Sequence, residues 1–198
     1  MGFYGDLENV LDYIAMSESF DGRRLIARLH TYLREGASLL EVGMGAGKDL
    51  ELLSRRYKAI GSDRSRVFLD LYCQKFPSAE LLELDAANLE LEETFDGIYS
   101  NKVLHHLSRT ELMRSFVRQH AILNPGGIAL HSFWAGVGQE EHNQLLYVYY
   151  EERDIRRLVE SHFEILEMKR YNEMKVADSI YVVLRRLNGV KSVGETLG

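Results

Sequence analysis

The segment Leu39–Gly47, with the sequence Leu-Leu-Glu-Val-Gly-Met-Gly-Ala-Gly, constrains the fold of this chain more than any other stretch. It begins as an apolar run, ends in three glycines at alternate positions, and leads into a helical pattern over Asp49–Arg56. Glycine tolerates the backbone angles of a tight turn and lets a ligand approach the main chain closely. The helix behind the turn offers free N–H groups. A strand, a glycine turn and a helix in this order predict the start of a nucleotide-binding α/β unit.

The spacing of the glycines separates this turn from two common phosphate-binding turns. In the dinucleotide fingerprint G-x-G-x-x-G the third glycine comes one residue later than it does here. A P-loop needs a hydroxyl after Gly-Lys, and Asp49 stands at that position. The remaining pattern, E-x-G-x-G-x-G, resembles motif I of the class I S-adenosylmethionine-dependent methyltransferases. In that family the turn holds the amino-acid part of the cofactor, so the resemblance implies cofactor contacts at Glu41, Gly43, Gly45 and Gly47.

Length and composition are those of one globular domain, since the chain has 198 residues of which 45% are apolar. The net charge of −6 gives no broad basic surface for nucleic acid. The single cysteine, Cys73, excludes an internal disulfide, and we expect it to be buried as a small apolar side chain. No signal peptide or membrane span is evident. We expect a cytoplasmic monomer or homodimer, with neither nucleic acid nor a membrane as partner.

The apolar periodicity predicts the order of helices and strands. Residues 1–35 contain two amphipathic helical patterns and are interpreted as an N-terminal helical lid. Strands are then predicted at about 38–43, 57–62, 79–84, 95–100 and 126–133, and helices between them at about 47–56, 64–76 and 109–123. This alternation indicates a parallel sheet with helices on both faces.

The last third of the chain departs from this alternation. Trp134–Asn143 is expected to be a loop, a helix is predicted over about 150–161, and two strands follow at about 163–171 and 178–187 with no helix between them. These two strands should pair as an antiparallel hairpin. The prediction is a single three-layer α/β/α domain over residues 36–187, with a seven-stranded, mostly parallel sheet. The resemblance implies the strand order 3-2-1-4-5-7-6, and residues 188–198 are expected to form a flexible tail.

The ends of the second and third predicted strands carry acidic residues. Asp63 follows Gly43 by twenty positions, the spacing of a ribose-binding carboxylate, although it could instead cap the next helix. Leu84–Leu89 resembles the family segment D-A-x-x-L, in which the aspartate and the next backbone N–H bind adenine. The resemblance implies these roles for Asp85 and Ala86, and the alternative is an Asx turn that leaves a strand.

The segment Phe95–Leu107 resembles F-D-x-V-x-S-x-x-V-L-H-H-L of the small-molecule methyltransferases related to ubiquinone and menaquinone biosynthesis. That resemblance implies that Asn101 lies beside the methionine end of the cofactor. His105 and His106 are candidates for a general base, because histidine takes a proton near neutral pH; lining of the cofactor pocket is the alternative. Metal-dependent relatives carry an aspartate where this chain has Asn101, so no metal is expected.

Aromatic residues in the variable parts of the chain are candidates for the substrate pocket. Tyrosine and tryptophan present an apolar ring with a polar tip, which suits a small-molecule site; the alternative is core packing. The candidates are Tyr13, Trp134, His142, Tyr147 and Tyr150. The resemblance then implies transfer of a methyl group from S-adenosyl-L-methionine to a small-molecule acceptor, with S-adenosyl-L-homocysteine as product. It leaves open whether oxygen, nitrogen or carbon attacks.

Two other functions stay open at this point. A nicotinamide-dependent oxidoreductase would share the glycine turn and Asp63, and the sequence from Tyr171 to Lys175 fits the Y-x-x-x-K motif of short-chain dehydrogenases. That motif lies on a helix in those enzymes but at a predicted strand end here. The second alternative is a cofactor-binding protein without transferase activity, because no single residue is obligatory for the transfer.

Overall fold

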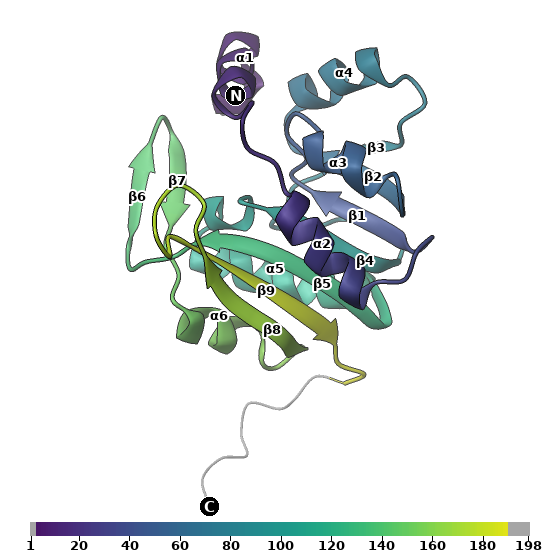
Figure 1. Ribbon diagram of the computed structural model, residues 1–198, viewed down its shortest axis with the longest axis vertical. Helices are drawn as coiled ribbons and strands as arrows, with labels where there is room; N and C mark the ends of the chain where they lie inside the picture. The colour runs from purple at the N-terminus through teal and green to yellow at the C-terminus, as the bar shows by residue number, and fades with distance from the viewer. Residues whose placement is uncertain (1–2, 190–198) are drawn as a thin grey trace, which may run out of the picture.

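Seven strands form one large sheet in the order β3-β2-β1-β4-β5-β9-β8 (Figure 1). The computed structural model describes residues 3–189, so positions 190–198 of the predicted tail lie outside the described residues. The parallel strands are β1 (Ser38–Val42), β2 (Lys58–Asp63), β3 (Leu81–Glu83), β4 (Phe95–Asn101) and β5 (Leu123–Trp134). β8 (Phe163–Tyr171) and β9 (Ser179–Arg186) run antiparallel at one end. Because β8 and β9 are the sixth and seventh strands of the large sheet, the observed order is the predicted 3-2-1-4-5-7-6, and the predicted fold is confirmed.

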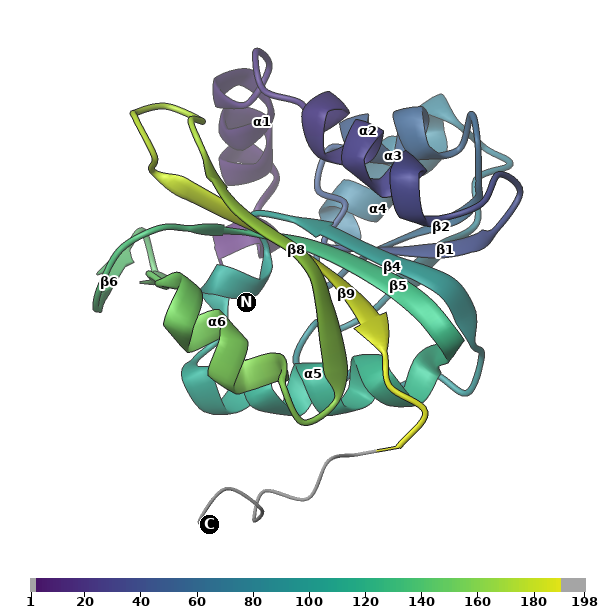
Figure 2. The ribbon, with the colours of Figure 1, turned by 60° about the horizontal axis from the view of Figure 1, so that its bottom comes forward.

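Helices cover both faces of this sheet (Figure 2). One face carries α2 (Arg23–Tyr32), α3 (Lys48–Leu53) and α4 (Arg66–Lys75), and the other carries α5 (Arg109–Ile122) and α6 (Glu152–Val159). The N-terminal helix α1 (Leu7–Met16) stands beyond the carboxyl ends of the parallel strands, where it contacts α4. Two short 3-10 turns, η1 (Phe3–Gly5) and η2 (Leu104–His106), are the other helical elements of residues 3–189.

The burial of β1 explains why its sequence is apolar without a break. Successive side chains of a strand point to opposite faces, and both faces of a parallel sheet are covered. Leu39 packs with the α2 residues Leu25 and Leu29, whereas Leu40 packs with Leu112 and Phe116 of α5. The alternation therefore attaches one helical layer to each side of the strand.

The start of α5 is fixed by a capping box, as the sequence predicts. The side chain of Ser108 accepts from the N–H of Glu111 at 3.3 Å, and the Glu111 carboxylate accepts from the N–H of Ser108 at 2.8 Å. Each bond satisfies a donor that the first turn of a helix leaves free. The boundary between η2 and α5 is therefore encoded locally.

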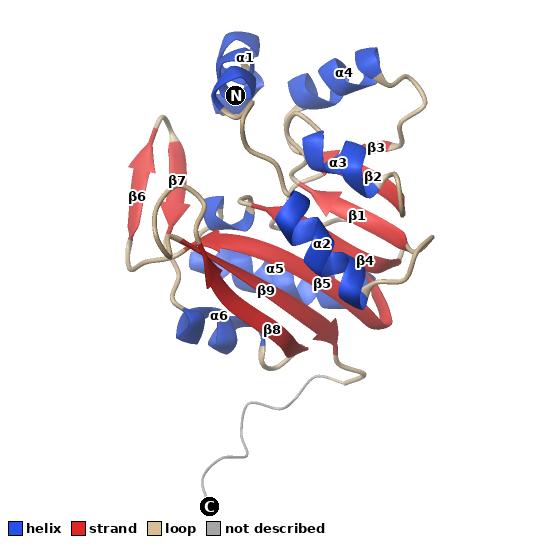
Figure 3. Ribbon diagram, in the orientation of Figure 1, coloured by secondary structure: helices blue, strands red, loops and turns tan. Residues whose placement is uncertain are grey.

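The region after β5 differs from the prediction. The predicted loop Trp134–Asn143 contains β6 (Gln139–His142), which pairs with β7 (Leu145–Val148) in a hairpin separate from the large sheet (Figure 3). The residues of β6 are polar and exposed, so they show no apolar alternation that could indicate a strand. β7 buries Leu145 and Val148, and these contacts place the hairpin.

Two smaller expectations are also corrected. Cys73 lies on the exposed side of α4 and is not buried. β5 begins at Leu123, three residues before the predicted start, because Leu123 pairs with Phe95 ahead of an irregularity in the register.

Candidate functional site

Two adjoining cavities lie beyond the carboxyl ends of β1, β2 and β4, the place where open α/β sheets bind ligands. The first, here called the Asp63 cavity, is lined by Asp63, Arg64, Phe68, Asp85 and Ala86 among others. The second, called the Trp134 cavity, is lined by Glu41, Asp49, Asn101, His105, Trp134 and Tyr147 among others. The residues that line both cavities are Tyr4, Tyr13, Gly43, Gly45, Lys102, Val103 and His106.

The glycine turn forms the floor where the two cavities meet. Gly43, Gly45 and Gly47 have φ angles of 72°, 50° and 77°, in the left-handed region that favours glycine. The N–H of Gly45 donates to Asp63 Oδ2 at 2.9 Å, which ties the turn to the end of β2. Gly47 lies behind the turn, where an added Cβ would come within 2.2 Å of the Tyr72 ring. Gly43 and Gly45 therefore line the cavities, whereas Gly47 serves the packing of α3 on Tyr72.

Asp63 is held from two sides at the end of β2. Its Oδ1 accepts from the N–H of Ser65 at 2.8 Å, and its Oδ2 accepts from the N–H of Gly45. Ser65 caps α4, so the helix-cap alternative for Asp63 does not apply. Burial raises the pKa of Asp63, and the two N–H bonds oppose that rise. These bonds fix the carboxyl group in place at the wall of the Asp63 cavity.

Asp85 and Ala86 follow β3 at the far wall of the Asp63 cavity. Asp85 is exposed, and its Oδ1 accepts from the N–H of Ala87 at 2.7 Å. The Asx turn is thus present, and the same residues also line the cavity. The two interpretations of this segment are compatible.

Buried carboxyl groups surround the Gly43 end of the Trp134 cavity. Glu41 is 3% exposed, and its Oε2 has no hydrogen-bond partner among residues 3–189. Burial, and then the charges of Asp49 and Asp63, raise the pKa of Glu41 well above its usual range. A buried acceptor without a partner is rare in folded proteins, so this carboxyl group is suited to a ligand with donor groups.

Asp49 is a site residue that the sequence patterns did not identify. Its carboxylate accepts from the Gly22 N–H at 2.6 Å, the Tyr99 hydroxyl at 2.7 Å and the Asn101 amide at 3.1 Å. The neighbouring Lys48 ammonium donates to the carbonyls of Ser17 and Glu18, at 2.8 and 2.6 Å. The first residues of α3 therefore hold both the Asn101 side chain and the segment that joins α1 to α2.

The N-terminal segment contributes aromatic rings to both cavities. Tyr4 and Tyr13 pack edge to face at 5.3 Å between ring centroids, and both contact Phe68 of α4. Among residues 3–35, only α1 and its flanking segments line the cavities, because α2 is packed on the sheet through Leu25 and Leu29. The arrangement places the predicted candidate Tyr13 at the junction of the cavities.

The histidine pair of η2 faces the same junction. His106 lines both cavities, and its Nδ1 lies 2.8 Å from the carbonyl oxygen of Leu146 in β7. His105 lines the Trp134 cavity, is 2% exposed, and has no partner for either ring nitrogen within the described chain. The two rings are in contact, 3.9 Å apart between centroids, with their planes tilted by 43°. Burial lowers the pKa of both imidazoles, so the pair is neutral at pH 7.

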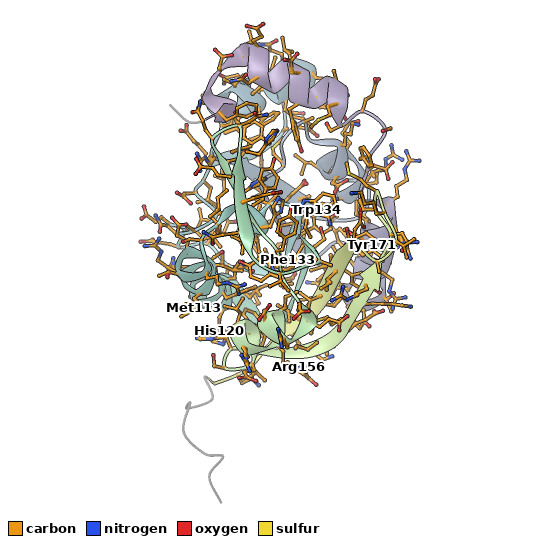
Figure 4. All side chains as sticks on the ribbon, turned by 90° about the vertical axis from the view of Figure 1, so that its left-hand side faces the viewer. Met113, His120, Phe133, Trp134, Arg156 and Tyr171 are labelled. Carbon is orange, nitrogen blue, oxygen red and sulfur yellow. The ribbon has the colours of Figure 1, made fainter. Side chains whose placement is uncertain are left out.

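Lys102 is the second site residue that sequence reasoning did not find. Its backbone has a φ of 56°, and its ammonium donates to the Phe133 carbonyl at 3.0 Å and to Ser179 Oγ at 2.6 Å. The same ammonium lies 3.6 Å from the centroid of the Trp134 ring. Figure 4 shows Trp134 near Tyr171, whose ring centroid is 5.4 Å from this ammonium. Burial lowers the pKa of Lys102 to about 7.

Two of the predicted substrate-pocket residues lie elsewhere. His142 is exposed on β6, and Tyr150 is buried in the core against Phe133, with ring centroids 5.3 Å apart. Neither lines either cavity, whereas Trp134 and Tyr147 line the Trp134 cavity. His142 belongs to a fully exposed strand, and Tyr150 follows β7 and packs into the core.

Within residues 3–189, no group of three histidine, cysteine, aspartate or glutamate side chains could hold a metal ion. None of the helices in the same range is long and apolar enough to cross a membrane.

Comparison with known proteins agrees with this geometry. Residues 39–127 match a family model described as a methyltransferase domain. No curated protein matches the chain. Among solved structures, the 1,6-didemethyltoxoflavin-N1-methyltransferase of Burkholderia thailandensis, with bound 1,6-didemethyltoxoflavin and S-adenosylhomocysteine, is 22% identical with a TM-score of 0.77, covering 91% of this chain and 84% of that one.

Two further structures are similar over nearly their full length. An S-adenosylmethionine-dependent methyltransferase from Clostridium acetobutylicum is 15% identical with a TM-score of 0.75, covering 91% of this chain and 99% of that one. A TehB-like S-adenosylmethionine-dependent methyltransferase from Corynebacterium glutamicum is 21% identical with a TM-score of 0.72, covering 91% and 98%. At these identities the likeness establishes the fold.

Proposed function

We propose that this chain transfers a methyl group from S-adenosylmethionine to a small-molecule acceptor, since residues 39–127 match a methyltransferase domain model and the fold is similar to that of solved methyltransferases. The cofactor supplies a methyl group activated by a positively charged sulfur. The observation that carries the proposal is the pair of cavities that meet at the glycine turn. One is suited to the adenosine part, through Asp63, Asp85 and Ala86, and the other is suited to the methionine part and the acceptor.

The charges of the site fit this cofactor. Its amino-acid part carries an ammonium group close to the positive sulfonium, so acidic groups favour its binding. Glu41 offers a buried oxygen without a partner, and Asn101 is held at both ends, by Asp49 and by the Ser132 hydroxyl at 2.6 Å. The chain itself binds the cofactor and the acceptor and orients them toward each other. Because the transferred methyl group is already activated, this orientation accounts for much of the acceleration of the reaction.

The same charges disfavour a nicotinamide cofactor, whose pyrophosphate is anionic. Asp49 lines the cavity beside the glycine turn, where its carboxylate would repel phosphate. Tyr171 is buried at the end of β8, and Lys175 is exposed in the loop that follows. The two residues do not share a helix face, so the dehydrogenase motif is not reproduced.

The acceptor is proposed to be a small molecule in the Trp134 cavity. Trp134 and Tyr147 give this cavity aromatic walls, and the similar Burkholderia enzyme was solved with bound 1,6-didemethyltoxoflavin. We propose no nucleic-acid or membrane partner, a cytoplasmic location, and a monomer or homodimer.

Calorimetric and thermal-shift titrations test the cofactor. Saturation with S-adenosylhomocysteine to about 100 times the dissociation constant adds about 2.7 kcal/mol, which raises the melting temperature by about 5–10 °C. We expect Asp63→Ala to weaken this binding at least tenfold. Asp70→Ala, which removes an exposed carboxylate of α4 paired with Arg66, is the matched control and leaves binding unchanged.

The outcomes of the titration separate the three functions. Stabilisation by NAD alone would refute the proposal in favour of an oxidoreductase. Binding of the adenosyl ligands, with no methylated product in a broad screen of phenols, amines, thiols and heterocycles, would favour a cofactor-binding protein without transferase activity.

A further inference from the structure

The histidine at the junction of the two cavities has a fixed tautomer. A backbone carbonyl oxygen only accepts, so the 2.8 Å contact between His106 Nδ1 and the Leu146 oxygen requires the proton to be on Nδ1. In a neutral imidazole the other nitrogen then carries a lone pair. Nε2 of His106 makes no hydrogen bond with any residue between positions 3 and 189 and is not among their buried atoms without a partner. It is an open proton acceptor in the cleft.

The position of His106 distinguishes it from the other titratable groups there. Four such side chains line both cavities, namely Tyr4, Tyr13, Lys102 and His106. Burial raises the pKa of the two tyrosines, so they keep their protons. Lys102 Nζ, whose pKa burial lowers to about 7, is bonded to the Phe133 carbonyl and Ser179 Oγ and lies over the Trp134 ring. Of the four residues, His106 therefore has the nitrogen that is unprotonated and free of contacts within the described chain.

The surroundings of His106 keep it neutral before it reacts. Burial lowers the pKa of the ring, the bond to the Leu146 carbonyl raises it, and the Arg64 guanidinium lowers it. The rings of His105 and Tyr147 pack against it, at 3.9 and 4.7 Å between centroids. If Nε2 gained a proton, the imidazolium would keep its bond to Leu146, and a charged donor makes that bond stronger.

We propose that the acceptor carries a proton on its attacking oxygen or nitrogen, and that Nε2 of His106 takes this proton during methyl transfer. The inference rests on the proposed function and narrows it to O–H and N–H acceptors. The attacking atom forms a bond to the methyl carbon, the carbon–sulfur bond breaks, and its electron pair stays on sulfur. The acceptor proton moves to Nε2, so the positive charge passes from sulfur to the imidazolium, and water later removes that proton.

His105 has a different role in this arrangement. It is neutral and buried, and neither of its ring nitrogens is exposed or has a partner within the described chain. Its ring packs against that of His106 at 3.9 Å between centroids, with the planes tilted by 43°, so His105 positions the base.

The test compares His106→Gln with the matched control His142→Gln, which makes the same substitution at an exposed residue of β6. Glutamine can still donate to the Leu146 carbonyl but takes no proton. Two reactions are measured: methylation of a panel of phenols and N–H heterocycles, and formation of S-adenosylmethionine from S-adenosylhomocysteine and methyl iodide, in which no proton moves.

We expect His106→Gln to lose about 10²–10⁴-fold in methylation of the protic acceptors. Its rate with methyl iodide and its affinity for S-adenosylhomocysteine should stay within about threefold of the wild type, since neither depends on proton transfer. His142→Gln should leave both reaction rates and the affinity for S-adenosylhomocysteine unchanged. A His106→Gln variant that methylates the panel within about threefold of the wild-type rate overturns the inference.

A second readout does not depend on finding an acceptor. Nitrogen-15 NMR of histidine-labelled protein at pH 7, assigned with the two variants, should show His106 neutral with its proton on Nδ1. An imidazolium, or a proton on Nε2, overturns the inference. A protein that fails to bind S-adenosylhomocysteine contradicts the proposed function itself, so the two failures are distinguishable.

Discussion

The substitution Gly43→Ala adds a methyl group where the turn after β1 lies close to the segment after β4, and its cost in stability tests how close this approach is. An alanine Cβ would lie 2.4 Å from Val103 Cγ1 and 2.6 Å from Cγ2, at a φ of 72°. The left-handed backbone costs an alanine about 1–2 kcal/mol, and overpacking adds about 1–3 kcal/mol. We expect Gly43→Ala to lower the free energy of unfolding by about 2–5 kcal/mol, measured by urea denaturation.

A matched glycine separates the two contributions. Gly36 has a φ of 73° and no atom within 4 Å of an added Cβ, so Gly36→Ala should cost only the backbone part, about 1–2 kcal/mol. Val103→Ala removes both clashing methyl groups. The double variant Gly43→Ala/Val103→Ala should be more stable than the sum of the single effects predicts, by about 1–3 kcal/mol. Equal costs at Gly36 and Gly43, or no coupling with Val103, would refute the reasoning.

Two further predictions concern the walls of the Trp134 cavity. Trp134 is the one tryptophan of the chain, so its fluorescence should titrate with a midpoint near the Lys102 pKa of about 7, and Lys102→Met should abolish the change. Because that pKa lies below the usual value for lysine, the unfolded state binds more protons than the folded state above pH 7. The unfolding free energy of the wild type should therefore rise with pH relative to that of Lys102→Met. A fall with pH would contradict the lowered pKa of Lys102. Asp49→Ala should cost about 2–4 kcal/mol in urea denaturation, since it leaves the buried Tyr99 hydroxyl and the Gly22 N–H without their acceptor. The exposed control Asp12→Ala should cost less than about 0.5 kcal/mol, and equal costs would show that these bonds contribute little.

The sequence predicts the elements whose signal is local. The apolar run at Leu39 and Leu40 indicates a strand buried on both faces, and Ser108 with Glu111 marks the start of a helix. Each depends on residues a few positions apart. β6 has no such signal, because its polar residues form a strand only by pairing with β7.

The same distinction applies to the site. Gly43, Gly45 and Asp63 belong to a spaced motif and lie together in the structure. Lys102 and Asp49 act through contacts with residues distant in sequence, such as Ser179 and Tyr99, which no spacing rule contains. Tyr150 was predicted at the pocket from its residue type, but it follows the hairpin, bridges to Ala135 and packs on Phe133 in the core, contacts that no local pattern contains.

The separate β6–β7 hairpin has a consequence for the evolution of acceptor specificity in such a protein. It is a two-stranded sheet of its own, and it reaches the site through the Leu146 carbonyl and the Tyr147 ring. The glycine turn follows β1, and Asp63 ends β2; both strands belong to the large sheet, which does not pair with the hairpin anywhere in residues 3–189. Exchange of residues 139–148 alone can therefore change which acceptors bind, while the residues that bind the methyl donor stay the same. This segment is the place to introduce a new acceptor specificity.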